Sequence, residues 1–185
     1  PDVIMRAMFA RGAFSQADAA NAAQTLSAYA IGLLPFVLIR SAVAPFQARK
    51  DTATPAKAAL IGVAANLAAK VALSGALAQT GLALATAIGA WVNLLIVVGF
   101  AVRANYIVFD RRLGLSLLKF AGSAVLLAAV LWMTAAVGAP RLLGHIHTGR
   151  EELTLALLVA VGAVVYLALI LALFGPRWVR SLIRA

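Results

Sequence analysis

The chain has 185 residues, of which 64% are hydrophobic and only 12% are charged. A soluble domain of this length is about half apolar and about a quarter charged, so the composition excludes an ordinary water-exposed globular surface. The formal net charge of +10 would usually indicate an anionic partner such as nucleic acid. The Lys and Arg residues cluster between apolar runs, however. This pattern favours membrane lipids as the partner, and we expect no nucleic acid. The absence of cysteine excludes a disulfide framework and a thiolate metal site.

The first residues are typical of a chain that continues from an earlier helix. The chain opens on Pro1 without a signal-peptide pattern, so we expect a piece of a longer protein. Residues 1–10 are too short to span a bilayer and are typical of the last turn of an earlier helix. Ser15, with Asp18 three residues later, has the spacing of a capping box. The first long helix should therefore begin near Gln16.

Five apolar stretches follow, and each is long enough to cross a membrane. About 20 helical residues span a hydrocarbon core of roughly 30 Å. The stretches are apolar on all faces, which disfavours the alternating strands of a barrel. The sequence therefore predicts an all-α fold, a polytopic transmembrane helical bundle with five spanning helices: Leu26–Ala44, Ala58–Ala78, Gly81–Val102, Leu113–Val137 and Leu153–Phe174.

Two further boundaries have recognisable sequence signals. Thr54-Pro55 fits an N-cap followed by a proline in the first helical turn, so the second spanning helix should start there. Phe174-Gly175-Pro176 fits a glycine C-cap followed by a proline that blocks continuation, so the last helix should end there.

The loop charges predict the orientation. If the five helices alternate in direction, the loops fall into two sets of unequal charge. Loops rich in Lys and Arg stay in the cytoplasm, so residues 45–56, residues 103–112 and the C-terminus should be cytoplasmic. The opposite set holds few positive residues, namely Arg6, Arg11, Arg141 and Arg150.

Three polar residues inside or beside the spans are candidates for a substrate pathway. A charge near the bilayer centre needs a partner, a wet cavity or a route to the interface. Lys70 either faces a water-filled pathway, with Asn66 one turn away, or extends its stem toward the far headgroups. Arg40, near the end of the first span, either lines a cavity mouth or reaches the cytoplasmic headgroups.

A stripe of small residues marks one face of the third span. Gly81, Ala85, Gly89 and Asn93 recur every four residues. Small residues let transmembrane helices approach closely, and Asn93 has the chemistry for a hydrogen bond across the contact. We expect this stripe to be a helix-packing face.

Nothing in the sequence supports catalysis. Ser116 and Lys119 have the S-x-x-K spacing of a serine acylase, but they open an apolar span without a partner motif. His145 and His147 lack a third ligand for a metal. Glu151 and Glu152 are typical of a solvated helix start. We therefore predict a non-enzyme with no catalytic residue, no metal site and no cofactor.

Three blocks, in order, resemble the MurJ/MviN family of lipid II flippases, within the multidrug/oligosaccharidyl-lipid/polysaccharide exporter superfamily. Residues 8–33, "MFARGAFSQADAANAAQTLSAYAIGL", resemble an external link and the helix after it. Residues 44–60, "APFQARKDTATPAKAAL", resemble the family's cytoplasmic hairpin, whose motif here is Arg49, Asp51, Thr54 and Pro55. Residues 81–93, "GLALATAIGAWVN", are close to the family's usual sequence.

The resemblance covers about half of the chain and has two departures. Gln47 stands where the family often has tyrosine, and Lys70 stands where many members have a polar asparagine. The last two spans match only in number, length and position.

The resemblance implies the C-terminal part of a fourteen-helix flippase fold. Residues 1–112 would then be the end of the C-terminal lobe, comprising the tail of one span and three transmembrane helices. Residues 113–185 would be the additional helix pair with a cytoplasmic tail. The family also implies that this pair, residues 113–137 and 153–174, forms a groove for the isoprenoid tail of the substrate.

The function implied is translocation of lipid II, an undecaprenyl-pyrophosphate-linked muropeptide, across the bacterial inner membrane by alternating access. The residues that grip the pyrophosphate would lie outside this chain. Two alternatives stay open on the sequence: a related exporter of another polyprenyl-linked saccharide or a drug, and a small membrane-embedded lipid-modifying enzyme or assembly subunit.

Overall fold

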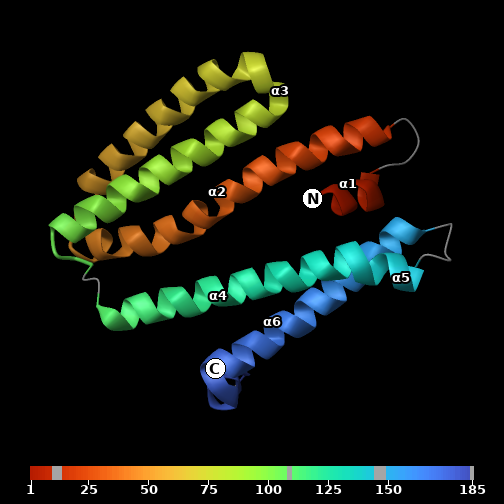
Figure 1. Cartoon of the computed structure of the whole chain (residues 1–185). Coiled ribbons are helices and arrows are strands. Elements are labelled where there is room, and N and C mark those ends of the chain that lie inside the picture. The colour runs from red at the N-terminus through yellow and green to blue at the C-terminus, as the bar shows by residue number, and fades with distance from the viewer. Residues whose placement is uncertain (10–13, 108–109, 144–148, 184–185) are drawn as a thin grey trace. The chain divides into compact units, whose positions relative to one another are not determined.

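The computed structural model describes residues 1–9, 14–107, 110–143 and 149–183, and nearly all of them are helical (Figure 1). The chain divides into two compact units, Pro1–Val108 and Phe109–Ala185, and each is described by itself. The division predicted at residue 112 concerns the lobes of a larger fold and stays a prediction. The elements in chain order are α1 (Asp2–Phe9), α2 (Gln16–Ala48), α3 (Ala53–Arg103), α4 (Arg111–Met133), the π-helical η1 (Thr134–Gly138), α5 (Ala139–Leu143) and α6 (Arg150–Ile183).

Five helical segments are long and apolar enough to cross a membrane, which confirms the predicted all-α polytopic fold. Each contains most of one apolar stretch named above. Their bounds are Gln16–Ala48, Ala53–Gly75, Leu77–Arg103, Leu113–Leu142 and Arg150–Leu173. Most of the helices are longer than the apolar runs. Polar residues are tolerated in the end turns of a spanning helix, because these turns reach the headgroups and water.

The start of α2 is set by the predicted capping box. The Ser15 hydroxyl accepts a hydrogen bond from the backbone N–H of Asp18 at 3.2 Å, and the Asp18 carboxylate accepts one from the Ser15 N–H at 2.9 Å. These reciprocal bonds satisfy two N–H groups that a helix start leaves without partners.

A proline inside α2 is matched by a tryptophan of α3. Pro35 has no N–H, so the carbonyl of Ile31, four residues earlier, loses its helical partner. The indole Nε1–H of Trp91 donates to this carbonyl at 3.1 Å. Gly32 brings the two helices together here, because a Cβ added to it would lie 3.2 Å from Cα of Ala87. This interhelical bond satisfies the carbonyl that Pro35 leaves unpaired.

Helix α3 is a hairpin of two spanning arms that fold back on each other (Figure 1). The reversal occurs at Ala78, whose backbone lies at φ 45° and ψ −124°, outside the helical region. Gly81 allows the tight reversal, since a Cβ there would lie 2.5 Å from the carbonyl oxygen of Leu73. The first arm is Ala53–Gly75 and the second is Leu77–Arg103.

The second unit is built from a long helical segment, α4 through α5, that packs against α6. Its π-helical part, η1, has the N–H of Ala139 bonded to the carbonyl of Thr134, one residue further back than in an α-helix. Pro140 follows directly and cannot donate an N–H. A widened turn next to a residue that breaks the α-helical ladder is a common way for a helix to continue past it.

The predicted end of the last helix is wrong. Helix α6 continues through Gly175 and Pro176 to Ile183. A proline removes a single N–H donor and bends a helix more readily than it stops one when the flanking turns hold. The C-cap signal therefore did not decide the boundary.

The Trp91 contact gives a testable prediction. We expect Trp91→Phe to destabilise the α2–α3 packing by about 1 kcal/mol, because it leaves the Ile31 carbonyl unpaired in hydrocarbon. In a Pro35→Ala background the same change should cost much less, since the substituted alanine restores the helical N–H. Fluorescent labels are placed on α2 and α3 in mixed micelles. The measured quantity is the mole fraction of SDS at which the two labelled helices separate. Trp132→Phe, on an exposed residue of α4, is the control. Equal losses of stability from Trp91→Phe in the parent chain and in the Pro35→Ala background would contradict the assignment.

Candidate functional site

The two arms of α3 cross at a pair of glycines that face one another. A Cβ added to Gly89 would lie 2.6 Å from Cβ of Asn66 and 2.8 Å from the carbonyl oxygen of Gly62. A Cβ added to Gly62 would lie 2.8 Å from Cβ of Asn93 and 3.0 Å from the carbonyl oxygen of Gly89. Each glycine thus accommodates an asparagine of the opposite arm, and the backbones approach closely.

A small groove of about 190 Å³ lies beside this crossing, with Phe36 of α2 on its wall. Three of its lining side chains are polar: Asn66, Thr86 and Asn93. The Thr86 hydroxyl donates to the Leu82 carbonyl at 3.0 Å. The Asn93 Oδ1 is buried and has no hydrogen-bond partner among the described residues. A buried acceptor without a donor is costly, so this groove is a place where a donor would be stabilised.

The structure separates the three residues predicted for a substrate pathway. Asn66 lines the groove at the hairpin crossing. Lys70 lies one turn further along the same arm, is half-buried, and forms no hydrogen bond or ion pair with the described part of the chain. Arg40 is exposed on α2 and does not line this groove. Asn66 therefore lies against the packing stripe, whereas Arg40 does not line the same groove.

The four residues of the predicted packing stripe lie along the second arm. Gly81, Ala85 and Gly89 are buried, and Asn93 is partly buried. Gly62 was missed in the sequence, although a signal for it exists. It precedes Asn66 by four residues, the same Gly-x-x-x-Asn spacing that relates Gly89 to Asn93.

The loop between α2 and α3 holds the predicted hairpin motif, but its cap differs from the prediction. Thr54 is not the N-cap; Thr52 occupies that position and makes no side-chain cap bond. The Asp51 carboxylate instead accepts a hydrogen bond from the Thr54 N–H at 3.0 Å. Bonds from the Thr54 side chain and backbone lower the pKa of Asp51 below its ordinary value. Pro55 lies in the first turn, where its missing N–H costs nothing.

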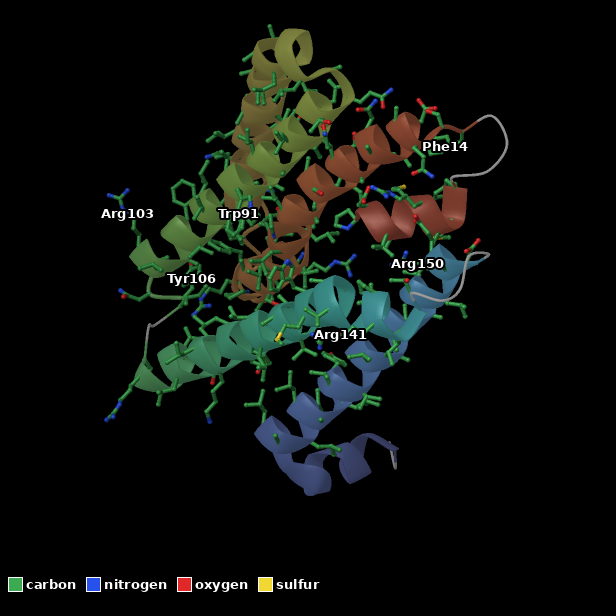
Figure 2. The ribbon with its side chains drawn as sticks, turned by 45° about the vertical axis from the view of Figure 1, so that its right-hand side comes forward. Phe14, Trp91, Arg103, Tyr106, Arg141 and Arg150 are labelled. Atoms are coloured by element: carbon green, nitrogen blue, oxygen red, sulfur yellow. The ribbon has the colours of Figure 1, made fainter. Side chains whose placement is uncertain are left out.

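Aromatic and cationic contacts fix this basic end of the first unit. The Arg49 guanidinium lies 4.0 Å from the centre of the Tyr106 ring, a cation–π contact. Tyr106 also meets Phe46 edge-on, with ring centres 5.2 Å apart, and Phe46 is only 1% exposed. Arg103 points away from the helices (Figure 2). The Arg49–Tyr106 contact thus joins the two basic loops, and Lys50 and Arg103 are exposed beside it.

The second unit contains an apolar groove of about 490 Å³ between α4 and α6. Its polar lining atoms are few. The Ser123 hydroxyl donates to the Lys119 carbonyl of its own helix at 2.8 Å, so it presents little polar surface. An extended hydrocarbon chain is the ligand that such a groove suits best. Its principal lining residues are Phe120, Ala124, Leu127, Tyr166, Leu169 and Ile170.

The residues considered for metal binding and catalysis give no assembled site. His145 and His147 lie outside the described residues. Within the described ranges there is no group of three or more His, Cys, Asp or Glu side chains that would hold a metal ion.

Residues 2–147 match the family model described as the lipid II flippase MurJ. The chain belongs to this family. It is 31% identical over 172 residues to a probable lipid II flippase MurJ of Rhizobium meliloti, covering 93% of this chain and 32% of the relative. It is 34% identical over 112 residues to that of Rhizobium tropici, covering 60% and 21%. The corresponding protein of Vibrio cholerae is 29% identical over 175 residues, covering 94% and 33%.

The chain thus spans about a third of the length of the MurJ relatives that it matches over most of its residues. Membership confirms the family inferred from the three sequence blocks. Together with the five segments able to span a membrane, it indicates a multi-pass membrane protein.

The glycine crossing predicts a stability difference between two matched substitutions. Gly89→Ala should destabilise the hairpin by about 1–3 kcal/mol, because the new methyl group collides with Asn66 and with backbone. Gly99→Ala, on the same arm with nothing within 4 Å of its Cβ, should be neutral or slightly stabilising. The measurement is the SDS fraction that separates labels on the two arms. Equal behaviour of the two variants would contradict the close approach.

The Asp51 cap predicts a pH-dependent difference. Because the folded pKa of Asp51 is below its ordinary value of 3.8, the carboxylate stabilises the loop above that value. This contribution is lost as the pH falls through the lowered pKa. Hydrogen exchange of the Thr54 amide should therefore be faster in Asp51→Ala than in the parent chain at neutral pH. The two rates should converge in strong acid, and a gap that persists there would contradict the role of the charge.

Proposed function

We propose that this chain is the C-terminal part of a fourteen-helix lipid II flippase that moves the lipid-linked peptidoglycan precursor across the bacterial inner membrane. The match of residues 2–147 to the MurJ family is the observation that carries this proposal. Five segments able to span a membrane support it, since this number corresponds to the tenth to fourteenth helices of such a fold.

In this proposal the headgroup crosses through a wet cavity while the prenyl tail stays in hydrocarbon. Lobes that rock about a central site give alternating access. The α4–α6 groove holds the tail, and its apolar lining supports this assignment. Lys70, Asn66 and Arg40 border the headgroup's path. The half-buried Lys70, which lacks a partner in the described ranges, supports a role beside an anionic or wet region.

The proposed orientation places the basic loops and the C-terminus in the cytoplasm. Arg49, Lys50, Lys57 and Arg103 are all exposed, and they lie in or next to the two loops joined by the Arg49–Tyr106 contact. Positively charged loops are retained on the cytoplasmic side, where they meet anionic headgroups.

A chimera tests this function. We expect the Rhizobium meliloti relative to support growth of flippase-depleted cells after its matching segment is replaced by this chain. Ala124→Trp in the chimera should strongly reduce complementation, because the indole fills the α4–α6 groove. Crosslinking of a photoactivatable polyprenyl phosphate to α4 should fall in parallel.

Ala129→Trp is the matched control. Ala129 is also an exposed alanine of α4, but it does not line the groove. A fully expressed chimera that fails to complement would overturn the flippase proposal. Equal effects of the two tryptophans would overturn the tail groove.

A further inference from the structure

A second pocket, of about 630 Å³, lies at the end of the first unit opposite the basic loops. It forms between the start of α2 and the turn of the α3 hairpin, and Phe14, labelled in Figure 2, is one of its lining residues. The polar side chains that line it come from both elements: Asp18, Asn21, Gln24, Thr25, Gln79 and Thr80.

The chemistry of this lining selects a class of ligand. Carboxamides offer both donors and acceptors, and hydroxyls do the same. Among the residues that the structure describes, no Lys or Arg lines the pocket, so this lining lacks the charge-assisted donors that a phosphate or pyrophosphate would need. The single carboxylate, Asp18, is bonded to both the N–H and the hydroxyl of Ser15, at 2.9 and 2.7 Å. A neutral ligand rich in hydroxyl and amide groups matches this set.

The two walls of the pocket are held in register. The hydroxyls of Thr25 and Thr80 lie 3.4 Å apart and join α2 to the hairpin turn. Ala78, at φ 45°, adopts a backbone conformation that is unfavourable for a non-glycine residue. Such strain persists only where the surrounding structure imposes it, and it is common at ligand sites. Here it directs the chain that carries Gln79 and Thr80 along the pocket wall.

We propose that this pocket binds a neutral, N-acetylated sugar. The inference rests on the proposed function, because lipid II carries a saccharide on its headgroup and the pocket lies at the end assigned to the external side. The pocket would then contact the saccharide after its passage, while the pyrophosphate is bound elsewhere.

Direct binding tests the proposal without requiring translocation. The whole 185-residue chain is placed in phosphatidylcholine nanodiscs, which avoids sugar-based detergents, and the probe is methyl N-acetylglucosaminide. We expect saturation-transfer NMR to show transfer from the protein to the acetyl and ring protons. The double variant Gln24→Leu, Gln79→Leu should weaken binding by about tenfold, the effect of losing one or two hydrogen bonds.

Gln47→Leu is the matched control, since Gln47 is an exposed glutamine of α2 outside the pocket, and it should bind like the parent chain. A second measurement needs no variant. In the unmutated chain, titration with the sugar should shift the side-chain amide resonances of Gln24 and Gln79 but not that of Gln47. This readout decides the matter even when the double variant does not fold.

Three results would overturn the site: no transfer to the sugar, unchanged binding in the folded double variant, or stronger transfer to putrescine that Asp18→Asn abolishes. The last result would assign the pocket to a cation. If the chain binds the sugar but the chimera does not complement, the sugar site is supported and the proposed flippase function is contradicted. If the chimera complements but the chain does not bind the sugar, only the proposed sugar site is contradicted.

Discussion

A backbone carbonyl that loses its helical partner inside hydrocarbon has no water to replace it, and this constraint organises the first unit. Pro35 creates such a carbonyl at Ile31, and the indole of Trp91 satisfies it at 3.1 Å. Gly32 lets α2 approach Ala87 closely at this point. The proline that would weaken an isolated helix therefore specifies where α2 meets the second arm of α3.

The same closeness has a cost at the hairpin crossing. Gly62 and Gly89 bring the two arms together, and the resulting contact buries the Oδ1 atom of Asn93 without a donor in the described part of the chain. Transmembrane helices gain little from hydrophobic burial in lipid, so close packing has to provide most of their association. The arrangement gains packing from two glycines and leaves one polar group available.

The sequence predicted the features that depend on one span or one turn. The lengths of the apolar runs predicted five crossings, and the Ser15–Asp18 pair predicted the start of α2, because both signals are local. The cap at Asp51 and the continuation of α6 past Pro176 were missed, since each depends on how neighbouring turns compensate a lost bond. Gly62 was missed for a different reason: its importance comes from the opposite arm, which sequence spacing alone does not place.

The two ends of the first unit differ in chemistry, and this difference bears on direction. One end carries exposed cations, among them Arg49 against the Tyr106 ring, whereas the other carries amides and hydroxyls with no lining cation in the described part of the chain. Anionic headgroups are attracted to the first end, and the second offers a neutral sugar hydrogen bonds without competing for its phosphates. Because α2 joins both ends through one continuous helix, a movement of this unit displaces the two surfaces together. In the function and orientation proposed above, a substrate with an anionic linkage and a neutral saccharide would then meet a different kind of surface at each side of the membrane.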